Sequence, residues 1–160
     1  VVATDVTGVG TARSAVAGCS YGEDKGIFGF GYPPNLNITN LVSNVGVVSA
    51  NVAGVGTARR TLAATEYGTD TAIFGFGTAD PITNITNLVS NTGVVATDTT
   101  GVGSVRYGLA ATQYGQDKGL FGFGDPATAI TNLVSNVGVV STDVTGVGTG
   151  RSGTMSCSYN

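Results

Sequence analysis

The chain has 160 residues, of which 26 are glycine and only 11% are charged, while a hydrophobic fraction of 41% and a mean hydropathy of +0.24 argue against a disordered chain. The formal net charge is −3, and the seven basic residues are spread along the sequence, so we expect no nucleic-acid partner. No apolar run approaches the length of a membrane-spanning helix, so we also expect no membrane insertion.

The chain consists of a repeated segment that occurs three times in full and once in part. The copies span residues 1–46, 47–93, 94–138 and 139–160, and each opens with Val-Val followed by Gly-Val-Gly. Three residues after the second of these glycines comes an arginine, at Arg13, Arg59, Arg106 and Arg151. Such self-similarity predicts a single domain of tandem repeats.

The three full copies share further residues after the arginine. An aspartate recurs at Asp24, Asp70 and Asp117. A Phe-Gly-Phe-Gly run follows it and contains Phe28, Phe30, Phe74, Phe76, Phe121 and Phe123. The hexapeptide Thr-Asn-Leu-Val-Ser-Asn then recurs unchanged at 39–44, 86–91 and 131–136.

The second copy shows the expected strands in chain order. Residues 61–67 alternate in polarity and end at Gly68-Thr69-Asp70, a composition typical of a tight turn, so residues 72–76 are predicted to return as the second strand of a hairpin. Proline in 78–82 predicts a loop, because proline lacks the N–H that a central strand needs.

The remaining strands of this unit are predicted from the residues after the loop. Residues 85–91 form the expected third strand, and residues 94–97 of the following copy form a fourth after an Asn-Thr-Gly turn. No segment shows a sustained apolar period of 3.6 residues, so we expect few helices.

The Phe-Gly-Phe-Gly strand is predicted to have one bulky and one bare face. Side chains alternate along a strand, so Phe74 and Phe76 are expected on one face and Ile73, Gly75 and Gly77 on the other. On the glycine side of such a strand a neighbouring sheet can approach closely. On the other side a neighbouring sheet receives the phenylalanine rings of the strand.

Four-stranded units of about 46 residues predict an all-β fold of β-propeller-like blades, with a β-solenoid as the alternative. The pattern resembles the kelch repeat, because the aliphatic–aromatic strand 73–77 ends in glycines and follows an arginine-led strand and a turn. The sequence of the repeat is also similar to tandem modules of large bacteriophage and environmental bacterial proteins. This similarity rests on the segments Thr-Asn-Leu-Val-Ser-Asn and Gly-Val-Gly-Thr-Ala-Arg. This resemblance implies a tail or surface component.

In this reading the chain begins at a fourth strand and ends at a first strand, residues 152–159. Three blades are fewer than a closed propeller needs. We therefore expect either an excerpt of a longer array or copies of the chain that assemble with one another.

The repeated arginines and aspartates allow two interpretations. Equivalent positions in a propeller converge on one rim and form a ligand-binding ring, or they hold loops together through Arg–Asp pairs or Arg–carbonyl bonds. Because the chain has so few charges, we expect the architectural role. The Gly-Val-Gly segments lack the helix and lysine of a phosphate loop and are expected to be turns.

Several further residues are interpreted from their place in the repeat. Cys19 and Cys157 occupy a position that is threonine in the other copies, which predicts either a small exchangeable side chain or a disulfide, within or between chains. Asn37 and Asn84 begin Asn-Ile-Thr sequons, which the repeat itself generates. The expected turn formers are Asp5, Asn51, Asp98 and Asp143.

These features predict a non-enzymatic structural or adhesive protein with no catalytic, cofactor-binding or metal-binding residues. The absence of histidine removes the usual triads and zinc sites. We expect an extracellular, cell-surface or virion location, as a filament subunit or a phage tail or fibre component whose partners are copies of itself. The alternative is a lectin that binds surface glycans through the proline-bearing inserts 32–35, 78–81 and 125–128, where Tyr32 is the one aromatic platform.

Overall fold

A computed structural model describes residues 7–158, which form strands and turns and contain no helix. The strands in this part of the chain are β1 (Ala17–Tyr21), β2 (Lys25–Gly31), β3 (Leu36–Val42), β4 (Ala63–Tyr67), β5 (Thr71–Gly75), β6 (Thr86–Val89), β7 (Ala110–Tyr114), β8 (Lys118–Gly122) and β9 (Thr131–Val134). The expected all-β class is therefore confirmed.

The strands form three antiparallel sheets, in the orders β1-β2-β3, β4-β5-β6 and β7-β8-β9. The hairpin predicted in the second copy is confirmed, because β4 pairs with β5 from Ala63–Gly75 to Tyr67–Thr71 around the turn 68–70. The predicted third strand is also present and is shorter than expected, as β6.

The predicted fourth strand at 94–97 is not formed, so each sheet has three strands and not four. Residues 94–99 are joined to β6 by isolated bridges, Val95 to Val89 and Thr99 to Thr86, and by the Ala96 N–H, which donates to the Leu88 carbonyl at 2.8 Å. A side chain interrupts the ladder between them: the Asn87 amide, in place of a main-chain N–H, donates to the Ala96 carbonyl at 3.0 Å. The first strand predicted at 152–159 is likewise not formed across its described part, 152–158.

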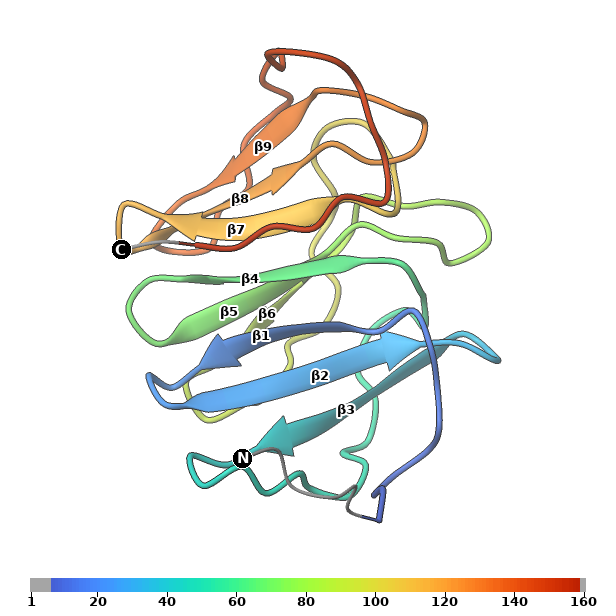
Figure 1. The fold of residues 1–160 in the computed structure, drawn as a ribbon, viewed down its shortest axis with the longest axis vertical. Coiled ribbons are helices and arrows are strands. Elements are labelled where there is room, and N and C mark those ends of the chain that lie inside the picture. Colours follow the sequence, from blue (N-terminus) through green and yellow to red (C-terminus); the bar gives the residue numbers. More distant parts are fainter. Residues whose placement is uncertain (1–6, 159–160) are drawn as a thin grey trace, which may run out of the picture.

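Figure 1 shows the three sheets following one another along the long axis of the molecule. The central strand β4 contacts both β1 and β7, so the first strands of the sheets lie next to one another. The third strands β3, β6 and β9 form no comparable contacts among the described residues. Residues 7–158 form an open series of sheets that closes into neither a barrel nor a propeller.

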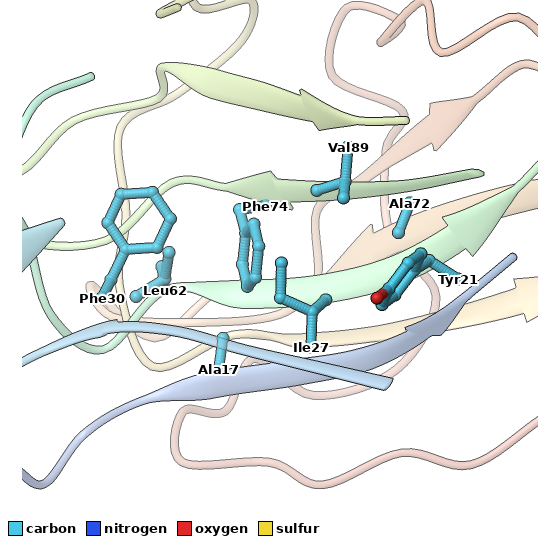
Figure 2. Close-up of a cluster of buried hydrophobic side chains, with 8 residues drawn as sticks. All are labelled: Ala17, Tyr21, Ile27, Phe30, Leu62, Ala72, Phe74 and Val89. Carbon is cyan, nitrogen blue, oxygen red and sulfur yellow. The ribbon is translucent and has the colours of Figure 1, made fainter. Parts of the chain in front are cut away.

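The core is divided into two clusters, one at each contact between consecutive sheets. Figure 2 shows the first, in which the rings of Phe30 and Phe74 lie between the first and second sheets. Their centroids are 5.1 Å apart in an edge-to-face arrangement, which aromatic pairs prefer. The second cluster repeats this arrangement between the second and third sheets with Phe76 and Phe121, whose centroids are 5.2 Å apart.

The predicted common face for Phe74 and Phe76 is wrong. Phe74 belongs to the cluster shared with the first sheet, whereas Phe76 belongs to the cluster shared with the third. The alternation breaks because Phe76 has a φ of +64°, a conformation that bulky residues rarely adopt. The same φ recurs at Phe30 and Phe123, and Phe30, like Phe76, belongs to the cluster shared with the following sheet.

Candidate functional site

Recurring phenylalanines, glycines and arginines meet where one sheet packs on the next, a contact that we call a junction. At the first junction the Phe74 ring packs on Gly29, where an added Cβ would lie 2.8 Å from Cζ of Phe74. At the second junction Phe121 packs on Gly75, where the corresponding distance is 2.7 Å. The expected close approach of a neighbouring sheet on the glycine side is therefore confirmed.

Each junction also holds an arginine whose guanidinium stacks on the second phenylalanine of the preceding sheet. Arg59 lies over the ring of Phe30 at 4.3 Å from its centroid, and Arg106 lies over Phe76 at 4.4 Å. Both arginines are almost completely buried. Burial lowers the pKa of Arg59 to about 10, so its guanidinium remains a cation at neutral pH.

The guanidinium of Arg106 is surrounded by acceptors from its own repeat. Nε donates to the Phe123 carbonyl at 2.8 Å, Nη1 donates to the Ser104 carbonyl at 3.1 Å, and Nη2 donates to Oδ1 of Asn132. The positive φ of Phe123 places that carbonyl within reach of Nε, which accounts for the rare conformation. Arg13 makes the corresponding bonds to Phe30 and Asn40 in the first repeat. These arginines use Arg–carbonyl bonds, and Arg106 also forms an Arg–Asp pair with Asp143 at 3.9 Å.

The recurring aspartates lie at the turns of the hairpins and form no pair with these arginines. Asp24 pairs with Lys25 at 2.9 Å and accepts a bond from Asn44. Asp70 accepts a bond from Asn91 at 2.8 Å, and Asp117 pairs with Lys118 at 2.7 Å. The arginines and aspartates occupy different parts of each sheet and do not form one ligand-binding ring.

Three of the predicted turn formers bond to distant segments instead of to their own turns. Asp98 accepts bonds from the main-chain N–H and the hydroxyl of Thr57, and from the amide of Asn87. Asp143 does the same with Ser104 and Asn132. Asn51 accepts bonds from the main-chain N–H of Thr11 and from the amide of Asn40, and its own amide donates to the Thr11 hydroxyl. Asp5 lies outside the described residues.

Acid is expected to weaken the second and third repeats through Asp98 and Asp143. Partial burial alone would raise the pKa of Asp98, but hydrogen bonds from Thr57 and Asn87 outweigh it, and the net pKa is lowered. Asp143 is shifted in the same direction by the same balance. Because the folded pKa is below the unfolded one, the stabilisation is present above about pH 4 and is lost as pH falls through the folded pKa.

The double substitution Asp98→Asn and Asp143→Asn tests this, since Asn51 already fills the same position in the first repeat. We expect the variant to lose less stability than the wild type between pH 7 and pH 2.5, measured as the fall in thermal midpoint. Equal falls in the two proteins would contradict the assignment.

The structure has no Cys19–Cys157 disulfide, because both thiols are free. One shallow hollow is lined by residues 18–20, 64–66, 111–113 and 156–158, so the equivalent positions of all four copies lie along one surface. Thr65 and Thr112 stand between the two cysteines, which excludes a bond within the chain. Burial, with a smaller contribution from Glu66, raises the pKa of the Cys19 thiol to about 12, so this thiol is protonated at neutral pH.

The sequon asparagines make structural contacts. The Asn37 amide donates to the Gly56 carbonyl at 2.7 Å, and the Asn84 amide donates to the Gly103 carbonyl. These bonds attach the third-strand region of one repeat to the Gly-Val-Gly turn of the next. Glycosylation at either amide would replace one of its two N–H groups, so it would compete with such a bond.

The proline-bearing inserts meet at Arg60, a residue that the sequence interpretation missed. Arg60 pairs with Asp80 at 2.9 Å, donates to Oδ1 of Asn35 at 2.7 Å, and lies 5.0 Å from the centroid of the Tyr32 ring. The available signal was that Arg60 is the one arginine outside the repeated positions. The third insert, 125–128, is not part of this group.

One hollow beside the last sheet has a volume of about 240 Å³ and is lined by residues of β7 and β8 and by residues 151 and 154–156. Among residues 7–158, no three His, Cys, Asp or Glu side chains gather as a metal site would require. Within the same residues no helix is long and apolar enough to cross a membrane.

Comparison with known proteins adds no relative to these observations. The chain matches no protein-family model, and no curated protein matches it.

Proposed function

We propose that the chain is a non-enzymatic structural and adhesive repeat protein that assembles with copies of itself. The observation that carries this proposal is the use of the recurring residues: their rings, guanidinium groups and amides hold one sheet against the next. Repeating such a junction extends a stack, because each unit buries apolar surface only against its neighbours.

The spread of the sheets supports propeller-like blades as the finer description of the fold. The first strands lie together along one edge while the third strands are apart, as in neighbouring blades around an axis. The bridged segments such as 94–99 take the place of a fourth strand in each blade. The proposal includes the resemblance of the repeat to the kelch repeat. The alternative to the propeller-like arrangement is a linear solenoid.

The proposed setting is extracellular, at a cell surface or on a virion, as a filament subunit or a phage tail or fibre component. Its support is the low charge, the tandem repeats and the apolar side chains at the Asn-x-Gly turns. Exposed valines on these turns are Val45, Val47, Val94, Val137 and Val139. Such side chains favour contact with another surface.

Glycan binding at the inserts remains the alternative function. The group around Arg60 combines an exposed aromatic ring with charged and amide side chains, which is the chemistry that a saccharide site uses. Its polar atoms are already bonded to one another, which favours the structural proposal. Saturable binding to a glycan panel that is lost in Arg60→Ala would favour the alternative.

Light scattering tests the proposal directly. We expect the purified chain, with reductant present to exclude disulfides through the exposed Cys157, to show a mass that rises with concentration in multiples of 15.9 kDa. A mass of 15.9 kDa that does not change up to millimolar concentration would overturn the proposal.

A further inference from the structure

We infer that copies of the chain join head to tail by repeating the internal junction. The open face of the first sheet, around Phe28 and Gly46, seats on the open face of the third sheet, around Tyr114 and Gly122. This inference rests on the proposed self-assembly and names the surfaces that carry it. Its basis is continuity with the two junctions formed inside the chain, which define what covers each kind of face.

The first matching pair of residues is a phenylalanine ring and the glycine on which it packs. Phe74 and Phe121 are fully buried on Gly29 and Gly75, whereas Phe28, at the same position of the first copy, is 47% exposed. Gly122 is the matching glycine of the last sheet, and a Cβ there would meet only Leu120 and Thr131, both at 3.4 Å.

The space beside Gly122 has room for an incoming ring. The hollow of about 240 Å³ on this face is lined by Leu120, Gly122 and Phe123 together with the chain segment 151–156. Phe28 therefore matches a vacant site on the other end of the same molecule.

A second, independent set of residues indicates the same head-to-tail direction of assembly. Tyr21 lies on Gly93, where an added Cβ would be 3.0 Å from its ring, and Tyr67 lies on Gly138 at 2.8 Å. These tyrosines are buried, but the equivalent Tyr114 is 38% exposed. Gly46, the equivalent glycine of the first repeat, has nothing within 4 Å of an added Cβ.

Main-chain bonds at the hairpin turns continue the pattern. The Gly22 N–H donates to the Asp70 carbonyl at 2.6 Å, and the Gly68 N–H donates to the Asp117 carbonyl at 2.8 Å. The next bond of this series joins the Gly115 N–H to the Asp24 carbonyl of a second copy. The head surface of one copy thus contacts the tail surface of another at three points. Phe28 meets Gly122, Gly46 meets Tyr114, and Asp24 meets Gly115.

Residues 151–158 occupy the place of the next sheet's first strand and must give way to the second copy. Arg151 lies over Phe123 at 4.3 Å from its centroid, and its carbonyl accepts a bond from the Gly124 N–H at 2.9 Å. The segment shares Arg-Ser and Cys-Ser with residues 13–20 at the same spacing. Arg13 of a second copy therefore replaces Arg151 with the same contacts, so the exchange of segments loses little.

Two single variants and their mixture test the direction of assembly. Phe28→Ala removes the ring from the head, and Gly122→Ala fills its site on the tail, where the isolated chain tolerates a Cβ. Each variant alone is expected to associate about tenfold or more weakly than the wild type, because a largely buried phenylalanine contact is lost. Circular dichroism of each variant checks that it is folded.

The mixture is the decisive sample. Gly122→Ala retains a functional head and Phe28→Ala retains a functional tail, so an equimolar mixture is expected to form a dimer of twice 15.9 kDa and nothing larger in sedimentation velocity. The matched control is Tyr32→Ala, which removes a ring of similar exposure, 44%, that lies beside Arg60 of the second sheet; it is expected to associate like the wild type.

The outcomes separate this inference from the proposed function. A wild type that associates while both single variants associate equally well overturns the head-to-tail surfaces and leaves self-assembly standing. Monomeric single variants whose mixture also stays monomeric exclude the directional contact. A wild type that is monomeric overturns both the proposed function and this inference.

Discussion

Replacing Phe74 with alanine is expected to lower the free energy of unfolding by about 3–5 kcal/mol. The ring is fully buried, packs edge-to-face on Phe30 and fills the space above Gly29, so its loss leaves a cavity at the first junction. Urea unfolding followed by circular dichroism, at concentrations below the range of association, measures the change.

Phe28→Ala is the matched control, since Phe28 occupies the same position in the first repeat and is half-exposed. We expect it to cost less than about 1 kcal/mol in the monomer, as is usual for surface substitutions. Similar losses for both variants would show that burial at the junction does not stabilise the fold.

Arg106→Ala is expected to cost about 3 kcal/mol or more, because it removes a buried cation that three acceptors and an aromatic ring surround. The carbonyls of Phe123 and Ser104 and the amide oxygen of Asn132 then lose their donor. Arg106→Lys is expected to recover only part of the loss, because an ammonium group cannot repeat the planar fork. The same unfolding measurement applies.

Arg151→Ala provides the comparison for the stacking contact alone. Arg151 stacks on Phe123 in the same way but is exposed, so its loss should cost about 1 kcal/mol or less. An equal effect of Arg106→Ala and Arg151→Ala would mean that the buried hydrogen bonds of Arg106 contribute little to stability.

The hairpins could be predicted because their signals are local. Alternating residues on either side of Gly68-Thr69-Asp70 specify both the strands and the turn, and the structure has β4 and β5 there. The prediction of a fourth strand was wrong for another local reason. The Asn87 side chain donates to the Ala96 carbonyl in place of a main-chain N–H, and the pattern of apolar residues does not reveal this bond.

The orientation of Phe76 could not be predicted from alternation. Its φ of +64° turns the ring toward the third sheet and under Arg106, a residue 30 positions later in the chain. Arg59 of the same repeat donates to the Phe76 carbonyl at 2.9 Å, whereas Arg106, which stacks on the Phe76 ring, belongs to the next repeat. The same reason explains why the sequence showed recurring arginines and aspartates without showing that, of these side chains, the arginines enter the junctions and the aspartates stay at the hairpin turns.

The sequence by itself determined the repeat, the all-β class, the hairpins and the close packing on the glycine side of β2 and β5, since these follow from turn chemistry and side-chain size within one copy. Only the tertiary structure decided which face each phenylalanine takes, which acceptors hold each arginine and that Cys19 and Cys157 are apart. Those features depend on contacts between copies, and the packing energy of the junction outweighs the local preferences of any single strand.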